Sequence, residues 1–167
     1  FPNIFNQKSN RFYKIVIIGV KKLKHTEALL KAEKFQQKME KIAQNDYWRP
    51  QYHIAAPANW INDPNGFCFY KGEYHLFYQY HPYSSQWGPM HWGHVASKDL
   101  ADWEHRPIAL APTDEYDKDG CFSGSAIEND GKLYLLYTGH VDLDNSNGGN
   151  DRIDTQCLAV RDDGKHF

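Results

Sequence analysis

From Tyr47 onward the chain alternates short apolar runs with clusters of turn-forming residues, which is the pattern of an antiparallel β protein. Aromatic and β-branched side chains dominate the runs, and both types favour strands. No helical periodicity interrupts them, so a parallel fold built from βαβ units is not expected. The predicted strands are GFCFY, EYHLFYQYH, HWGHVAS, WEHRPIAL, SGSAIEN, KLYLLYTG and TQCLAVR, and the predicted hairpin turns are YKGEY and NDGKL.

The region before Tyr47 has a different period. Apolar side chains recur there at the spacing of an amphipathic helix, with Lys and Glu on the other face. Thr26 can cap the start of this helix, and Asn45 can end it. We therefore expect a poorly ordered arm at 1–24, a helix at 25–46 and a β region at 47–167. The apolar positions of the helix are Leu29, Ala32, Phe35, Met39 and Ile42.

The β region contains two units that resemble each other. YKGEYHLFYQYH aligns with NDGKLYLLYTGH, which places Gly72 opposite Gly131 at a shift of 59 positions. Each unit holds about four strands, and repeated four-stranded antiparallel units are typical of propeller blades. Because a propeller ring has at least about four blades, two units predict an incomplete ring.

The same shift relates the segment WINDPNG, residues 60–66, to the start of the second unit. It places Asp63 opposite Phe122 and NDPN opposite CFSG. The first strands of propeller blades line the central channel, so Asp63 and the FSG segment are expected to face one shared funnel. A β-sandwich would place them differently, and NDPNG on its own predicts nothing more than a surface β-turn.

Charge and hydropathy limit the partners of this chain. Its 167 residues carry a net charge of −2, and the mean hydropathy is −0.75. This balance argues against nucleic-acid binding, which depends on basic contacts to phosphates. The longest apolar run, Ile15–Val20, is far shorter than the ~20 residues that a membrane-spanning helix needs.

The spacing of cysteine and histidine gives no sign of a metal site. Cys68, Cys121 and Cys157 are an odd number of cysteines without metal-type spacing, and reduced, buried thiols in the cytoplasm are the simplest interpretation. His91 and His94 stand three apart, which puts them on opposite faces of a strand. We expect no metal and no cofactor.

Several ordered motifs in residues 47–167 together resemble glycoside hydrolase family 32, the β-fructofuranosidases. They are HIAAPANWINDPNGFCFYKGEYHLFYQYHPYSSQWGPMHWGHVASKDLADWEHRPIALAP and, later, DGCFSGSAIENDGKLYLLYTG. The resemblance implies a five-bladed propeller, usually followed by a C-terminal β-sandwich. The expected fold class is therefore all-β, with the first two four-stranded antiparallel blades of that propeller preceded by the N-terminal amphipathic helix.

The resemblance also implies roles for individual residues. Asp63 in WINDPNG matches the catalytic nucleophile of the family. The family's RDP motif, whose Asp stabilises the transition state, and its EC motif, whose Glu is the acid/base, do not occur in this sequence. RDD at 161–163 lacks the proline of the RDP motif. The matched substrate-binding positions are Trp60, Ile61, Asn62, Gln79, Trp87, Phe122 and Ser123.

The implied function is that of a retaining glycoside hydrolase that cleaves terminal β-D-fructofuranosides, either sucrose or sucrose 6-phosphate, through Asp63. The acid/base, the other blades and the β-sandwich would come from sequence beyond Phe167, so this segment alone is expected to be inactive. An exo-acting fructanase on levan or inulin is an alternative enzyme. A non-catalytic sugar-binding propeller or a remnant fragment is the alternative from another class. The expected partner is a small-molecule sugar, and neither nucleic acid nor a membrane is expected.

Overall fold

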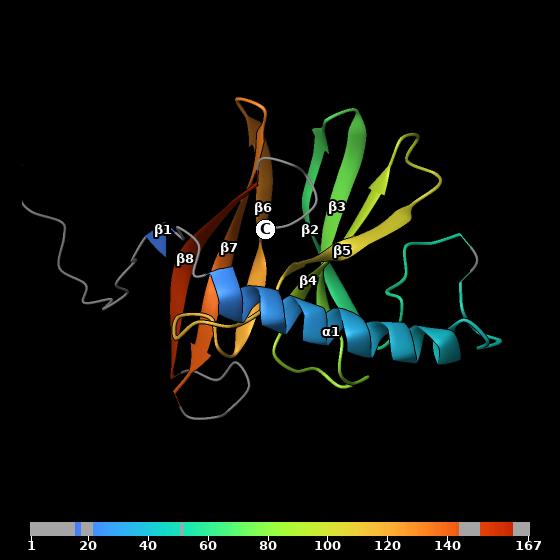
Figure 1. Cartoon of the computed structure of the whole chain (residues 1–167), viewed down its shortest axis with the longest axis horizontal. Coiled ribbons are helices and arrows are strands. Elements are labelled where there is room, and N and C mark those ends of the chain that lie inside the picture. The colour runs from blue at the N-terminus through green and yellow to red at the C-terminus, as the bar shows by residue number, and fades with distance from the viewer. Residues whose placement is uncertain (1–15, 18–21, 51, 144–150, 162–167) are drawn as a thin grey trace, which may run out of the picture.

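The computed structural model of the chain describes residues 16–17, 22–50, 52–143 and 151–161, and it contains two four-stranded sheets and a long helix (Figure 1). The two sheets confirm the predicted all-β class, and each predicted strand lies within an observed one or overlaps it. The elements are β1 (Val16–Ile17), α1 (Lys22–Ala43), β2 (Trp60–Tyr70), β3 (Glu73–His81), β4 (His91–Ser97), β5 (Glu104–Leu110), β6 (Gly120–Asn129), β7 (Lys132–Asp142) and β8 (Arg152–Arg161).

Two tight turns close the hairpins that the repeat predicts. Between β2 and β3, Lys71 and Gly72 have φ angles of 50° and 85°. Between β6 and β7, Asp130 and Gly131 have φ angles of 50° and 73°. Two successive residues with positive φ form the turn whose twist matches that of the flanking strands. The predicted turns at YKGEY and NDGKL are therefore confirmed.

The strands of each sheet are neighbours in the sequence, with one exception. The first sheet has the order β2-β3-β4-β5, and all its pairs are antiparallel. In the second sheet β6, β7 and β8 pair in the same way, but β1 lies parallel to β8, with Val16 opposite Cys157. Within the predicted arm at 1–24, the two β-branched residues at 16–17 form the short strand β1. Residues 1–15 and 18–21 lie outside the described residues.

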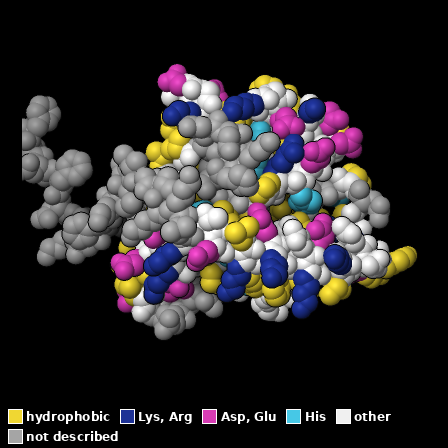
Figure 2. All heavy atoms as spheres, viewed as in Figure 1, with side chains coloured by type: hydrophobic (Ala, Val, Ile, Leu, Met, Phe, Trp, Pro, Cys, Tyr) yellow, Lys and Arg dark blue, Asp and Glu magenta, His cyan; other side chains and the backbone are white. Residues whose placement is uncertain are grey.

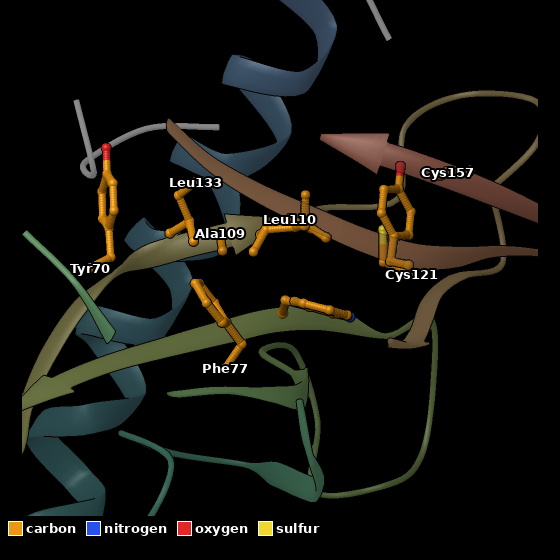
Figure 3. Packing of buried hydrophobic residues seen from close by; sticks show 10 residues of the cluster. Tyr70, Phe77, Ala109, Leu110, Cys121, Leu133 and Cys157 are labelled. Atoms are coloured by element: carbon orange, nitrogen blue, oxygen red, sulfur yellow. The ribbon is translucent and has the colours of Figure 1, made fainter. Parts of the chain in front are cut away.

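A shared apolar core joins the two sheets (Figure 3). Phe77 and Trp92 of the first sheet belong to one fully buried cluster with Leu133 of the second. Burying one large apolar side chain contributes about 1.5–3 kcal/mol, so this cluster stabilises the pairing of the sheets. Cys121 and Cys157 lie in the same cluster, where burial raises the pKa of both thiols, that of Cys157 to about 11.

The helix α1 packs against the other face of the first sheet. Leu29 and Ala32 are buried there in a second cluster with Val95 and Ile108. Phe77 and the neighbouring Tyr78 fall in different clusters because successive strand residues point to opposite faces. Figure 2 shows basic side chains along the outer face of α1. No helix among the described residues is long and apolar enough to cross a membrane.

The ends of α1 differ partly from the predicted ones. The helix begins at Lys22, so the predicted N-cap at Thr26 is wrong, and Thr26 lies inside the first turns. The helix ends at Ala43, and the side chain of Asn45 donates a hydrogen bond to the carbonyl oxygen of Lys41 at 2.9 Å. Ile42 is 64% exposed, because the last turn runs past the apolar surface on which Leu29 and Ala32 pack.

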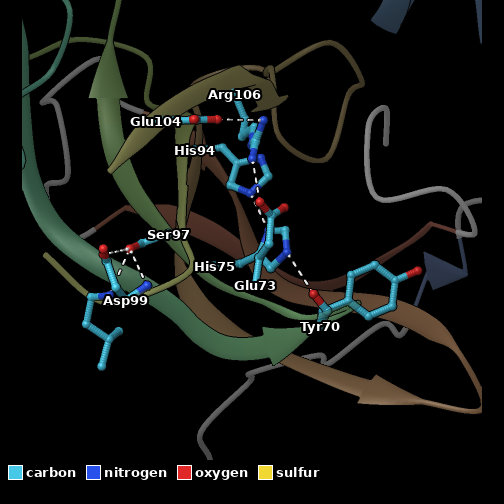
Figure 4. A network of polar contacts seen from close by, with 9 residues as sticks. Tyr70, Glu73, His75, His94, Ser97, Asp99, Glu104 and Arg106 are labelled. Atoms are coloured by element: carbon cyan, nitrogen blue, oxygen red, sulfur yellow. Dashed lines mark hydrogen bonds and ion pairs between the residues drawn. The ribbon is translucent and has the colours of Figure 1, made fainter. Parts of the chain in front are cut away.

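Polar contacts link the strands of the first sheet (Figure 4). Nδ1 of His75 lies 2.9 Å from Nε2 of His94, and Nε2 of His75 lies 3.2 Å from the carbonyl oxygen of Tyr70. Near the surface, Arg106 pairs with Glu73 at 2.9 Å. His94 therefore has a structural role in this sheet. Within the described ranges, no group of three His, Cys, Asp or Glu side chains is arranged to hold a metal ion.

Candidate active site

The segment WINDPNG lies in the strand β2 and not in a tight turn. Ile61 pairs with Tyr80, but the next partners are Pro64 and Tyr78, so β2 contains one residue more than β3 at this point. This extra residue makes a β-bulge, which bends a strand and re-aims its side chains. Proline suits such a position because it has no N–H to donate to the neighbouring strand. The surface β-turn that the segment alone predicts is therefore wrong.

The strand β6 has an irregularity at the corresponding place. Phe122 pairs with Thr138, and the next partners are Ser125 and Leu136, so β6 also carries one extra residue. The two bulges meet across the seam between the sheets. Ser123 Oγ donates a hydrogen bond to Oδ2 of Asp63 at 3.0 Å. The prediction that Asp63 and the FSG segment face one shared space is confirmed.

Further hydrogen bonds hold the two bulged strands in place. The backbone N–H of Gly124 donates to Oδ1 of Asn65 at 3.3 Å. Within β2, the indole N–H of Trp60 donates to Oδ1 of Asn62 at 2.7 Å. This bond orients the Asn62 amide and leaves its NH₂ group able to donate to a ligand. Asp63 thus lies in a backbone that is fixed on both sides.

The bulges open onto a cavity of about 330 Å³, at the lower end of the size of small-molecule sites. Asp63 is exposed, and the solvent that it faces is this cavity. Six of the eight predicted site residues line the cavity, whereas Trp60 and Ile61 do not. The lining residues are Asn62, Asp63, Gln79, Trp87, Met90, Phe122, Ser123, Thr138, Arg152 and Asp154.

The cavity combines flat apolar surfaces with neutral polar groups. Trp87 and Phe122 meet edge to face, with ring centroids 6.1 Å apart. Gln79 is 2% exposed and donates through Nε2 to the carbonyl oxygen of Cys121 at 3.0 Å, which leaves its own carbonyl oxygen as an acceptor. Apolar faces suit the C–H surface of a sugar, and a fixed amide can select its hydroxyl groups.

Three polar residues of the cavity were not among the predicted ones. Thr138 comes from β7, and its hydroxyl accepts a hydrogen bond from Nε2 of Gln156 at 3.1 Å. Arg152 and Asp154 come from β8, and Arg152 Nε lies 3.1 Å from Asp154 Oδ2. The alternating charges of DRID, residues 151–154, are the signal in the sequence that could have drawn attention to them.

Asp154 adds a second carboxyl group to the cavity, but it is not suited to act as a general acid. Its Oδ1 lies 2.8 Å from Nδ1 of His140, and its Oδ2 faces Arg152. A general acid has to turn its proton toward the leaving group, whereas both oxygens of Asp154 face partners within the protein. The described residues that line the cavity thus include two carboxylates, of which Asp63 is hydrogen-bonded to a neutral hydroxyl and Asp154 contacts His140 and Arg152.

Comparison with known proteins identifies the family to which this arrangement belongs. The profile of the Glycosyl hydrolases family 32 N-terminal domain matches residues 53–167. The chain belongs to glycoside hydrolase family 32. The motifs that carry the resemblance in the sequence lie within this match, and the family assignment is confirmed.

Relatives of this family 32 chain include sucrose-6-phosphate hydrolase of Zymomonas mobilis, 54% identical over 83% of the chain, and raffinose invertase of Escherichia coli, 51% identical over 79%. The chain spans about a quarter of the length of these relatives, 27% and 28%. Among solved structures, a β-fructofuranosidase of Bombyx mori is 48% identical to this chain and has a TM-score of 0.74. The match covers 85% of this chain and 29% of the Bombyx mori chain. A mutant of that Bombyx mori enzyme has been solved in complex with sucrose.

Proposed function

We propose that the chain is the nucleophile-bearing part of a retaining β-fructofuranosidase. The observation that carries this proposal is the hydrogen bond from Ser123 to Asp63 in a cavity of sugar size. In a retaining glycosidase one carboxylate attacks the anomeric carbon and forms a covalent glycosyl-enzyme intermediate. Asp63 takes this role here, because its position is fixed by hydrogen bonding and it faces the open space of the cavity.

The reaction divides into steps that different groups serve. The carboxylate of Asp63 attacks C2 of the fructosyl unit, and the bond from C2 to the leaving oxygen breaks. Trp87 and Phe122 pack against the sugar, while Gln79 and Ser123 hydrogen-bond its hydroxyl groups. The oxocarbenium-like transition state of this attack is stabilised by the negative charge of Asp63, and water then hydrolyses the covalent intermediate, which releases fructose and frees the carboxylate.

A second carboxyl group has to protonate the leaving oxygen, about 5–5.5 Å from the first. Asp154 is engaged by His140 and Arg152, and the RDP and EC motifs are absent from the sequence. We therefore assign the acid to another part of the full-length gene product. On this proposal the 167-residue segment binds sugar but hydrolyses it very weakly or not at all.

The two sheets are proposed as the first two of five propeller blades. Large apolar side chains remain exposed on strands of both sheets, among them Phe67 at 58%, Ile127 at 56% and Leu136 at 43%. In the proposed ring, these side chains belong to the surface that neighbouring blades would bury. Additional blades would cover it and complete the wall of the funnel.

Sucrose and sucrose 6-phosphate are the proposed substrates, since both present a terminal β-D-fructofuranosyl unit. An exo-acting fructanase on levan or inulin remains the alternative, because such a chain ends in the same unit. Comparing the kcat/KM of the full-length gene product on sucrose, sucrose 6-phosphate and inulin separates these substrates.

The decisive test replaces the nucleophile in the full-length gene product. Asp63→Ala is expected to lower kcat for sucrose roughly 10⁴-fold or more, as removing a covalent catalyst does in other enzymes. Asp102→Asn, in an exposed turn of the first sheet, is the control and should retain full activity. If Asp63→Ala hydrolyses sucrose at more than a tenth of the normal rate, Asp63 is not the nucleophile. If the unaltered protein cleaves no fructoside, the proposed function is wrong.

A further inference from the structure

The wall of the cavity that β8 forms carries a charged cluster that the attack by Asp63 does not use. The antiparallel register of β7 and β8 places His140 opposite Asp154 and Asp142 opposite Arg152. Four charged or titratable side chains thus gather on two neighbouring strands. Two of them, Arg152 and Asp154, line the cavity.

At the centre of this cluster, His140 contacts two carboxylates. It is fully buried, with Nε2 3.0 Å from Oδ1 of Asp142 and Nδ1 2.8 Å from Oδ1 of Asp154. Each ring nitrogen thus contacts the oxygen of a different carboxylate. It also stacks on Phe122, with centroids 4.0 Å apart and planes at 12°. The stacking on Phe122 and the contacts with the two carboxylates together fix the position of the His140 ring.

Asp154 is held from both sides and still reaches the cavity. His140 contacts one of its oxygens and Arg152 the other, yet the side chain is 33% exposed. A carboxylate oxygen has two lone pairs, so each oxygen can accept a further hydrogen bond from a ligand. A pre-oriented acceptor of this kind binds hydroxyl groups without first having to be ordered.

The strand order indicates which part of a substrate would meet Asp154. Asp63 and Ser123 lie on β2 and β6, whereas β8 is separated from β6 by β7. Two strand spacings amount to about 9–10 Å. This separation between the strands is the reason for assigning Asp154 to a group beyond the sugar ring at Asp63.

We propose that Asp154 binds hydroxyl groups of the sugar on the leaving-group side of the scissile bond, and that His140 is the positioning residue that holds Asp154 there. The inference rests on the proposed function, because it needs a fructosyl unit at Asp63.

The test measures sucrose hydrolysis by the full-length gene product. In Asp154→Asn, KM for sucrose should rise about tenfold, the effect of one hydrogen bond to a charged group, while kcat changes less than threefold. The inhibition constant of free fructose should stay within twofold, since fructose does not reach β8. The matched control Asp102→Asn, the same chemical change in an exposed turn, should alter none of these constants.

His140→Gln tests the positioning role. KM for sucrose should again rise about tenfold, and the double variant with Asp154→Asn should be no worse than either single one, because the two residues act through one contact. A purely structural His140 would instead lower kcat and raise the fructose inhibition constant as well. If His140→Gln does not fold, Asp154→Asn decides alone.

Two results would overturn the inference. An unchanged KM for sucrose in Asp154→Asn, with normal hydrolysis by the unaltered protein, excludes the role of Asp154 and leaves the proposed function intact. A parallel rise in the fructose inhibition constant would place Asp154 beside the fructosyl ring and not beside the leaving group. Absence of hydrolysis by the unaltered protein would refute the proposed function and this inference together.

Discussion

The carboxylate of Asp63 is oriented by a hydroxyl group 60 residues away in the chain. Ser123 is a neutral donor, so it orients Asp63 without placing a positive charge beside the carboxylate. The other groups of the cavity follow the same principle, since Gln79 and Asn62 are also held by hydrogen bonds of their own. At this scale the candidate site is a set of side chains that are ordered before a ligand arrives.

The buried carboxyl group of Asp117 predicts that the stability of the fold depends on pH. It is 2% exposed, and it accepts hydrogen bonds from the backbone N–H groups of Thr113 and Asp114 and from the hydroxyl of Tyr137. Burial is the main cause that raises its pKa above the ordinary 3.8, although these hydrogen bonds act in the opposite direction. The folded protein therefore holds this proton more tightly than the unfolded chain. The stability that results is fully present below pH 3.8 and is lost as the pH rises through the raised pKa.

Asp117→Asn removes this titration and keeps a carbonyl oxygen as acceptor. The free energy of unfolding of the variant, measured by urea titration at a series of pH values above 3.8, should fall less steeply with pH than that of the parent. Asp102→Asn, which changes an exposed carboxylate, should keep the parent's slope. Identical slopes for Asp117→Asn and the parent would show that Asp117 is not responsible for this pH dependence.

Among the elements, local sequence predicted the strands and hairpins but not the shape of β2. The turns at Gly72 and Gly131 could be predicted because positive φ is a local requirement that glycine meets. Pro64, Asn65 and Gly66 suit a turn and a bulge equally well, and the packing of β2 against β6 decides between them. That packing is a tertiary contact, which no local pattern encodes.

The same reasoning explains which site residues the sequence missed. The motifs of the family lie on β2, β3 and β6 and in the loop before β4, and they led to six of the residues that line the cavity. Arg152 and Asp154 belong to no motif, and they reach the cavity because β8 pairs with β7 in one particular register. Register over a whole strand depends on long-range pairing and is weakly specified by local sequence.

The close approach of β2 and β6 predicts a difference between two glycines. Both Gly66 and Gly72 have positive φ, 52° and 85°. A Cβ on Gly66 would lie 2.9 Å from Cβ of Ala126, whereas a Cβ on Gly72 would meet nothing within 4 Å. Gly72→Ala should therefore cost about 1 kcal/mol of unfolding free energy from the left-handed backbone alone. Gly66→Ala should cost about 1–3 kcal/mol more, because it also overpacks the seam.

Urea denaturation of the two variants measures this difference. The backbone cost is common to both, so the difference reports the contact between the strands. Equal losses of stability for Gly66→Ala and Gly72→Ala would mean that β2 and β6 do not approach as closely as described.

For the whole molecule, the exposed apolar side chains of both sheets predict self-association. Phe67 and Phe69 on β2 are 58% and 57% exposed, and Ile127 on β6 is 56% exposed. The 167-residue chain, purified on its own, should therefore associate as its concentration rises, which light scattering during size-exclusion chromatography detects. The full-length gene product, in which further blades are proposed to cover these faces, should elute as a monodisperse species. A sharply melting monomer of the short chain at every concentration would contradict the propeller proposal.

The hydrogen bond between Asp63 and Ser123 can form only after the ribosome has incorporated both residues. A ribosome that adds about 5–20 residues per second incorporates the serine roughly 3–12 s after the aspartate, since 60 residues separate them. The residues of the hairpins β2–β3 and β4–β5 have been synthesised by the end of that interval, while β6 is still being made. Translation that pauses in this window would leave an aspartate without the neighbour that orients it, and binding competence would begin with the emergence of the second sheet.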